Sequence, residues 1–285
     1  MSFLKTVFRI SAQNFRKWQT DYRIWTIAVF LLVMTLMYVD DFKKVADVIN
    51  EAVPVWIFPF LYMQYYTKLL FMLPVVLMFC DAPFTDNNQM FVITRTTSTR
   101  WLCGQLLYII LASGIYFLFL FVISLLTTII YGNFSLDWGR TLSAIGYAQS
   151  VTYDADVRYT VVSARVLEYF TPPLACFYTF MISWLAGIFL GLISFVCNLF
   201  TGSRFWGIAV CSFFVIFSIA AGRLPYAEWF SPIAWTTLNM IDIGGLTDHP
   251  GIGYCLGVYL GAIALLTLAI LIFGRRKSLD VKGDQ

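Results

Sequence analysis

Long apolar runs separated by short polar segments dominate this chain of 285 residues. A helix of about 20 apolar residues crosses the hydrocarbon core of a membrane. Six runs are candidates for such helices: 24–39, 55–80, 102–131, 174–200, 205–221 and 252–273. Pro59 and Pro74 interrupt the second of them. The pattern therefore predicts an all-α, polytopic integral membrane protein with six transmembrane helices in a domain that covers residues 24–273.

The first 23 residues show a different pattern, with helical periodicity and two faces. At 100° per residue the apolar side chains of Leu4, Phe8, Phe15, Trp18 and Tyr22 share one face. The opposite face is basic and carries Lys5, Arg9, Arg16 and Arg23, with Lys17 nearby. This pattern predicts an amphipathic helix that lies in the membrane interface. Such a helix is either an entry helix that also touches a partner or a simple membrane anchor.

The connections between the predicted spans differ in length and character. The loops 40–53, 132–172 and 222–250 are expected on one side of the membrane. Within the second of these loops, residues 163–170 form a candidate short helix ahead of Pro172 and Pro173. The third loop is apolar and broken by prolines, which predicts short half-helices that dip into the outer leaflet between spans five and six.

The charges choose the orientation, because positively charged residues gather in cytoplasmic segments. Most lysine and arginine residues lie in the N-terminus, the loops 81–101 and 201–204, and the C-terminal tail 274–285. Acidic residues are concentrated in the opposite loops, as at Asp40, Glu51 and Asp137. We therefore predict a multi-pass protein of the plasma membrane whose N- and C-termini are both cytoplasmic.

Composition supports the membrane assignment and argues against several functions. Apolar residues make up 60% of the chain and charged residues 12%, too few to cover a water-soluble globule. The six cysteines form no Cys-x-x-Cys pair and the single histidine, His249, lies in a turn-like sequence, so no metal site is expected. No clustered acids, serines or histidines predict catalysis, and no extended basic face predicts nucleic-acid binding.

The loop 81–101 carries the most informative local pattern. The apolar residues Met90, Phe91 and Ile93 are unusual in a cytoplasmic loop, and either Thr85 or Asp86 is a candidate helix cap ahead of them. Arg95 and Arg100 flank a polar Thr/Ser run that leads into the third span. A short helix with an apolar ridge and flanking arginines is a docking element for a partner's groove. The alternative is a loop that rests on the lipid surface.

Two features inside the spans also need an interpretation. Lys68 lies near the middle of the second run, where a charge is costly. It either faces a translocation pathway or extends along a tilted helix to the interface. Glycines at four-residue spacing, Gly187 with Gly191 and the series Gly253, Gly257 and Gly261, allow close helix packing within the chain or between chains.

These segments together resemble the permease subunits of type-2 class ATP-binding cassette (ABC) exporters. In that family an interfacial helix precedes six spans, and a coupling helix after the second span docks on the ATPase subunit. Residues 93–105, Ile-Thr-Arg-Thr-Thr-Ser-Thr-Arg-Trp-Leu-Cys-Gly-Gln, are similar to its arginine, small polar run, arginine and Gly-Lys opening of the third span. Ser231-Pro232 resembles the Ser/Asn-Pro of its outer half-helices.

The resemblance implies a transport subunit and not an enzyme. ATP and magnesium would be bound by a separate cytoplasmic ATPase subunit, since the chain has no Gly-x-x-x-x-Gly-Lys-Ser/Thr phosphate loop. A second permease copy or a related permease would complete the exporter, and family habit suggests an amphipathic substrate such as a peptide, lipid or hydrophobic drug. Residues of the loop 81–101 would couple ATP hydrolysis to transport: Asp86, Met90, Phe91, Ile93, Arg95 and Arg100.

Two other functions stay open at the level of sequence. An ion-coupled secondary carrier usually needs buried carboxylates, and Lys68 is the only plainly intramembrane charge. A membrane-embedded lipid-modifying enzyme needs convergent catalytic side chains, which the spans do not offer.

Overall fold

The computed structural model describes residues 2–84, 96–132, 134–148, 157, 160–245 and 247–283, with side chains up to Arg275. Within these residues the fold is all-helical, and the one β-type contact is an isolated bridge between Asp242 and Gly251. Five helices are long and apolar enough to cross a membrane. They are α2 (Tyr22–Ile49), α5 (Ser98–Ile129), α9 (Pro172–Thr201), α10 (Arg204–Ala221) and α11 (Ile252–Gly283).

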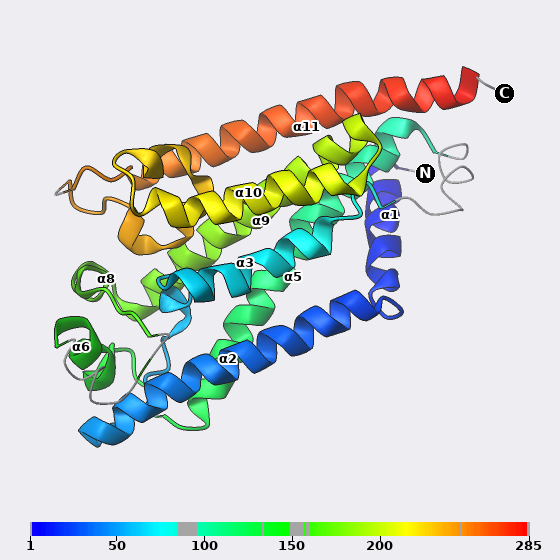
Figure 1. Cartoon of the computed structure of the whole chain (residues 1–285). Coiled ribbons are helices and arrows are strands. Elements are labelled where there is room, and N and C mark those ends of the chain that lie inside the picture. The colour runs from blue at the N-terminus through cyan, green and yellow to red at the C-terminus, as the bar shows by residue number, and fades with distance from the viewer. Residues whose placement is uncertain are drawn as a thin grey trace.

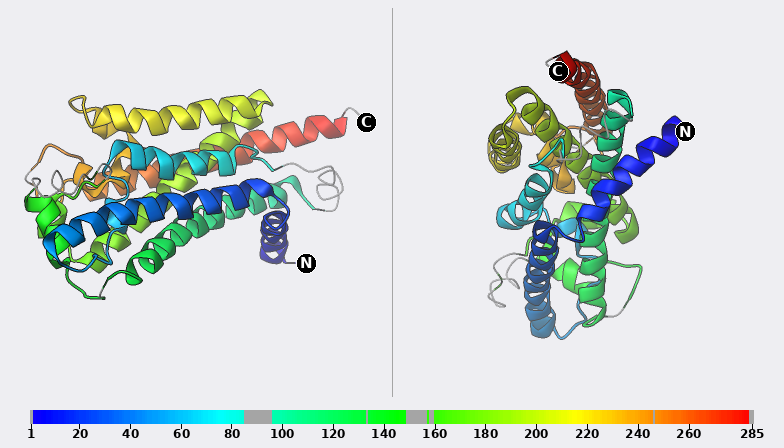
Figure 2. Two further views of the ribbon diagram at one scale, coloured as in Figure 1. Left: turned by 60° about the horizontal axis from the view of Figure 1, so that its bottom comes forward. Right: turned by 90° about the vertical axis from the view of Figure 1, so that its right-hand side faces the viewer.

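These helices and the shorter α3 (Tyr65–Phe79) run side by side in one elongated bundle (Figure 1). Helix α1 (Phe3–Lys17) lies across one end of the bundle, as the two turned views in Figure 2 show. Both chain termini are at this end, which we call the α1 end. The opposite end carries the small helices: α6 (Gly139–Tyr147), α8 (Ala164–Tyr169), η1 (Phe58–Phe60), η2 (Ala227–Phe230), η3 (Pro232–Thr236) and η4 (Leu238–Met240).

Helix α9 is the centre of the bundle and contacts α3, α5, α10 and α11. Two of its glycines permit the close approach of neighbours. A Cβ added at Gly187 would lie 2.8 Å from the Phe117 ring, and one at Gly191 would lie 2.6 Å from the Ile109 side chain. This glycine pair therefore packs within the chain. The series from Gly253 to Gly261 differs, because nothing lies within 4 Å of their added Cβ atoms.

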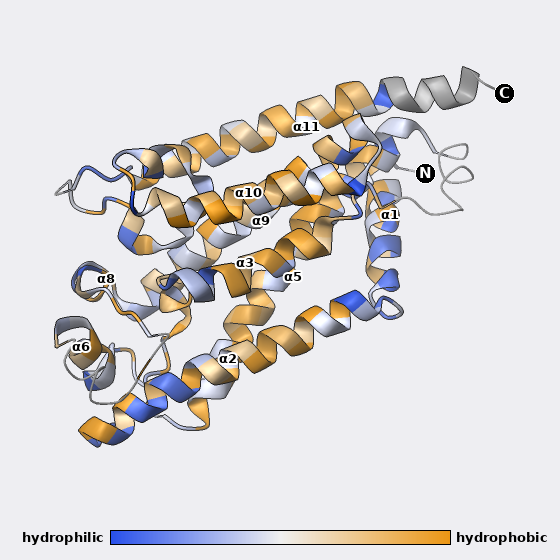
Figure 3. Ribbon diagram, viewed as in Figure 1, coloured by the Kyte–Doolittle hydropathy of each residue, from blue (hydrophilic) through white to orange (hydrophobic). Residues whose placement is uncertain are grey.

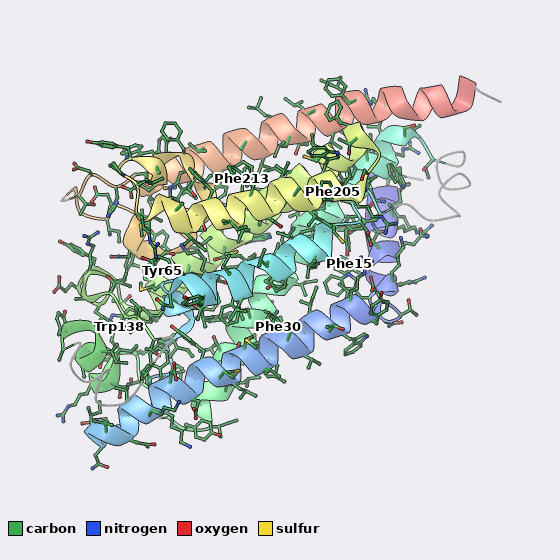
Figure 4. The ribbon with its side chains drawn as sticks, viewed as in Figure 1. Phe15, Phe30, Tyr65, Trp138, Phe205 and Phe213 are labelled. Carbon is green, nitrogen blue, oxygen red and sulfur yellow. The ribbon has the colours of Figure 1, made fainter. Side chains whose placement is uncertain are left out.

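The outer helices leave much of their apolar surface uncovered. Figure 3 shows hydrophobic residues along most of α10, along the middle of α2 and along much of the coloured part of α11. On α10, Phe205 and Phe213 are 66% and 60% exposed, and Figure 4 shows both along that helix. Apolar surface of this extent is not stable in water, whereas lipid chains cover it at no cost. The burial pattern thus agrees with the helix lengths in indicating a multi-pass membrane protein.

Several predicted boundaries differ from the structure. Helix α2 extends to Ile49, where Asn50 ends it in the left-handed conformation, so most of the predicted loop 40–53 is helical. Helix α11 continues through the predicted tail to Gly283. The predicted N-terminal helix ends at Lys17, because Asp21 caps the start of α2 through the Arg23 N–H. The short helix expected at 163–170 is confirmed as α8.

The second predicted span differs most. Only 65–79 form an α-helix, and Pro74 lies inside it without ending it. Residues 52–62 are irregular apart from η1, yet all of them except Ala52 are buried. Their carbonyl groups accept hydrogen bonds from side chains of four other elements, which is what makes irregular backbone tolerable inside a bundle. These bonds are Thr141 Oγ1 to Ala52 O (2.8 Å), Thr128 Oγ1 to Val55 O (3.3 Å), Tyr38 OH to Phe60 O (2.9 Å) and Thr237 Oγ1 to Tyr62 O (2.8 Å).

The segment between α10 and α11 is also irregular and well packed. It forms the three short 3₁₀ helices η2, η3 and η4, and the predicted position of these short helices in the outer leaflet stays a prediction. Helix η3 packs against α9, α10 and α11, with Trp235 fully buried. The Tyr259 hydroxyl donates to Pro232 O at 2.6 Å and ties this segment to α11.

Replacement of Tyr38 by phenylalanine tests the role of side chains in holding the irregular segment. The change removes the hydroxyl that donates to Phe60 O and leaves this carbonyl with its second bond alone, from the Met63 N–H at 3.1 Å. Because one of two hydrogen bonds is lost, we expect the free energy of unfolding to fall by about 0.5–1.5 kcal/mol in a denaturing-detergent titration. Tyr22→Phe is the matched control, since Tyr22 is 76% exposed, and should change stability by less than about 0.5 kcal/mol. Equal effects of the two changes would contradict the assignment.

Candidate functional site at the α1 end

Helix α1 presents three faces to its surroundings. Val7, Ile10 and Asn14 are buried against the bundle. Leu4 and Phe8, which belong to the predicted apolar face, are instead exposed (67% and 58%). The basic residues Lys5, Arg9 and Arg16 occupy a third, exposed face. One face therefore packs on protein, while the exposed apolar and basic faces suit lipid and water respectively.

The buried face of α1 packs tightly on the start of α5. Gly104 permits the contact, because a Cβ there would lie 2.6 Å from the Cβ of Ile10. The Asn14 side-chain amide donates to Gln105 Oε1 at 2.7 Å, and both residues are buried. A buried amide pair satisfies both partners only in one register. The contact thus fixes the position of α1 along α5.

An aromatic cluster continues this contact at the C-terminal end of α1. Phe15 and Phe84 each pack edge-on against Tyr108, with ring centroids 5.0 and 4.8 Å apart. The Trp18 indole N–H donates to the Tyr108 hydroxyl at 2.8 Å. Figure 4 shows Phe15 where α1 meets the bundle. The cluster joins α1 and α5 to Phe84, the last described residue before 85–95.

A charged cluster lies beside the aromatic one. Asp81 follows directly on the end of α3 and forms ion pairs with Arg23 of α2 and Arg204 of α10, the latter at 2.9 Å. Arg23 also pairs with Asp21 at 3.2 Å. The Asp81 side chain is 17% exposed, so its charge is partly shielded from water and needs these partners. Asp81 therefore links three helices at their α1 ends.

Asn198 of α9 holds the backbone around Asp81. Its side-chain amide donates to Cys80 O and to Ala82 O, both at 2.8 Å, and its Oδ1 accepts the Gly207 N–H at 3.1 Å. One turn earlier the Ser194 hydroxyl donates to Phe79 O at 2.9 Å. These bonds satisfy the carbonyl groups that the end of α3 leaves open.

Lys17 of α1 adds the last tie, through its ammonium group to Phe84 O at 3.4 Å. Residues 79–84 are thus held by α1, α2, α9 and α10 at once. We call these residues the anchored segment. Because they lead directly into the predicted docking loop, movement of that loop would act on four helices.

The structure describes only some of the residues that the sequence predicts for the coupling site and the interfacial helix. Lys17 donates to the anchored segment at Phe84 O, and Arg100 lies in the first turn of α5. Five predicted coupling residues fall outside the described residues: Asp86, Met90, Phe91, Ile93 and Arg95. Asp81, Asn198, Arg204 and Tyr108 were not predicted as site residues. The sequence indicates this site only through the position of Asp81 at the start of the predicted docking loop. The ion-pair partners of Asp81 are more than 50 residues away, so the sequence does not indicate them.

Lys68 is buried near the start of α3, with 4% of its surface exposed. Helix α3 as a whole packs against α9 and α10. Among the described residues no carboxylate forms an ion pair with Lys68. A cavity of about 480 Å³ lies between α2 and α3 and is lined by Thr67 and Leu70 but not by Lys68. A role of Lys68 in a translocation pathway stays a prediction.

No protein-family model, no curated protein and no solved structure matches this chain. Within the described residues no three histidine, cysteine or acidic side chains are grouped as they would be around a metal ion. His249 instead contacts the Glu228 carboxylate through Nδ1 at 2.8 Å, in the loop before α11. At the α1 end, by contrast, Asp81, Arg23, Arg204 and Asp21 form three linked ion pairs, and we take this end as the candidate site.

Proposed function

We propose that this chain is the transmembrane permease subunit of an ABC exporter in the plasma membrane. Its termini and the α1 end face the cytoplasm in this proposal. A separate ATPase subunit binds and hydrolyses magnesium-ATP there, and a second copy or a related permease completes the transporter. The cargo is an amphipathic molecule such as a peptide, a lipid or a hydrophobic drug.

The observation that carries the proposal is the anchored segment. A subunit that receives mechanical work needs a rigid connection between its docking element and its spans. The segment supplies one through Asp81, which pairs with Arg23 and Arg204, and through Asn198, which binds the backbone on both sides of Asp81. A loop that merely rested on lipid would have no need of ties to four helices.

The arrangement of the helices supports the same proposal. The α1 helix lies across the bundle, and the chain passes along the bundle with α2, α3, α5, α9, α10 and α11 before it ends on the side where it began (Figure 1). The proposal counts the shorter α3 as a sixth passage, and the distribution of basic residues supports this count together with cytoplasmic termini. The interfacial position of α1 follows from its exposed apolar and basic faces.

Co-isolation and activity measurements test the proposal. The full chain, purified from its native membrane in mild detergent, should carry an ATPase subunit with it. The reconstituted complex should hydrolyse ATP faster when an amphipathic cargo is added, and a double change of Met90→Ala and Arg95→Ala should abolish this stimulation. Lys5→Ala with Arg16→Ala, on the exposed face of α1, is the control and should keep it. A chain that never co-isolates an ATPase would refute the proposal.

A second candidate is an ion-coupled carrier, which the buried ammonium group of Lys68 favours. Such a carrier would move its cargo in sealed vesicles under a pH gradient without ATP. Gradient-driven uptake that is lost on Lys68→Met would support this function over the exporter.

A further inference from the structure

Two cavities adjoin at the bend between α1 and α2. The first has a volume of about 120 Å³ and a polar wall that includes Lys17, Arg23 and Arg204. Asp21 and Asp81 contribute two carboxylates to the same wall. Among the described residues that line this polar cavity, three side chains are cationic and two are anionic, so the described wall carries a net positive charge.

The second cavity is an apolar groove of about 260 Å³ on the outer surface of α2 and α5. Its wall includes Ile27, Ala28 and Leu31 from α2 and Ile115 and Phe119 from α5. Ile115 and Phe119 are 43% and 37% exposed, so the groove opens toward the surroundings of the bundle. In a membrane this surface faces lipid chains.

The two cavities share the side chains of Trp18, Ile24 and Met78 as a common wall. Trp18 is held in place by its hydrogen bond to Tyr108. Tryptophan favours the boundary between headgroups and hydrocarbon, because its ring is apolar and its N–H is polar. The shared wall therefore marks the depth at which a polar head passes into an apolar chain.

We propose that the paired cavities bind one acidic phospholipid, with its phosphate in the polar cavity and an acyl chain along the groove. Arg204 is suited to the phosphate because its side chain is 72% exposed and, among the described residues, its guanidinium forms one ion pair, through Nη1, to Asp81. The remaining donors of such a planar group match phosphate oxygens. Acidic lipids are enriched in the cytoplasmic leaflet, which is where the proposed orientation places the α1 end.

The charge balance favours an acidic lipid over a zwitterionic one. The net positive cavity attracts an anion. The positively charged choline group of a zwitterionic lipid would be repelled by Arg204 and Lys17. The groove favours a lipid over a free phosphate, because an anion alone leaves the apolar wall uncovered. The inference depends on the membrane orientation but not on an ATPase partner, so it stands or falls separately from the transport function.

Native mass spectrometry of the full chain tests the inference. The protein is released from detergent micelles that contain equal amounts of phosphatidylglycerol and phosphatidylcholine with the same acyl chains. We expect one phosphatidylglycerol to be retained per chain, about tenfold more often than phosphatidylcholine. The double variant Lys17→Gln with Arg204→Gln should lose this preference, and Ala28→Trp, which fills the groove, should lower retention of both lipids.

Matched controls make the result decisive. Lys5→Gln with Arg16→Gln removes the same charge from exposed positions outside the cavity and should keep the preference. Circular dichroism should show the same helix content in all variants. Equal retention of the two lipids, or an equal loss in the control, would overturn the inference. A third result would also overturn it: millimolar inorganic phosphate displaces the lipid, and the Ala28→Trp variant retains as much lipid as the wild type. That combination would indicate a site for the anion alone.

Discussion

Replacement of Asn198 by alanine should destabilise the protein more than any other single polar change at the α1 end. The side chain makes three hydrogen bonds to backbone groups of Cys80, Ala82 and Gly207. Alanine leaves these three groups without their side-chain partner. Water cannot easily replace that partner, because Asn198 is only 6% exposed. Each buried group left unsatisfied costs about 1–3 kcal/mol, so we expect a loss of about 3 kcal/mol or more in the free energy of unfolding. A denaturing-detergent titration followed by tryptophan fluorescence measures it.

Two further variants separate hydrogen bonding from simple packing. Asn198→Asp keeps the shape and the acceptor for Gly207 N–H, but it sets a carboxylate against the carbonyls of Cys80 and Ala82. Its loss at neutral pH should be at least as large as that of alanine. Thr201→Ala, on the exposed end of the same helix, should change stability by less than about 0.5 kcal/mol. Wild-type stability of the aspartate variant would show that shape alone matters.

In the proposed exporter the same change has a functional effect. The anchored segment would no longer transmit the movement of the docking loop to α9 and α10, while the loop itself would be unaltered. ATP hydrolysis by the partner should then persist but lose its response to cargo. Loss of the partner from the purified complex would instead indicate a role in docking.

Hydropathy predicts the long helices well because each is determined by residues close together in sequence. The predicted runs 174–200 and 205–221 differ from α9 and α10 by one or two residues, since Pro172 and Gly202 mark their ends locally. The prediction of one span over 55–80 was less accurate, because only Tyr65–Phe79 form an α-helix. Its first part is as apolar as a span, and what keeps it irregular is a set of distant hydroxyl groups such as Tyr38 and Thr237.

The site is less predictable for the same physical reason. The amphipathic pattern of α1 is confirmed as a helix with exposed basic residues, but only Phe15 and Trp18 of the predicted apolar face contact α5, and most of the contact is made by another face. Val7, Ile10 and Asn14 form that face because Gly104 leaves room for them on α5. Nothing near position 14 or 104 in the sequence indicates the partner. Likewise Asp81 resembles any loop carboxylate until the fold brings Arg23 and Arg204 to it.

Substitutions at Gly104 and Gly257 should have opposite effects on stability. Both glycines lie inside helices, where alanine is favoured over glycine by about 1 kcal/mol. At Gly257 the added methyl group meets nothing within 4 Å, so Gly257→Ala should stabilise the protein by up to that amount. At Gly104 it meets Ile10 at 2.6 Å, and overpacking of this kind costs about 1–3 kcal/mol. Gly104→Ala should therefore be neutral to destabilising, and Gly104→Leu should displace α1 altogether.

Displacement of α1 is measurable without knowledge of the cargo. Trypsin cleaves after basic residues, and α1 contains four of them: Lys5, Arg9, Arg16 and Lys17. Cleavage needs an extended backbone, so its rate follows the fraction of molecules in which α1 is detached, and a loss of about 1.4 kcal/mol raises that fraction tenfold. Gly104→Leu should raise the rate by at least about tenfold, while Gly257→Leu should leave it unchanged. Because Asn14 and Trp18 follow Ile10 on the same helix, detachment would also break their bonds to Gln105 and Tyr108. An unchanged cleavage rate in Gly104→Leu would mean that α1 does not depend on its contact with α5.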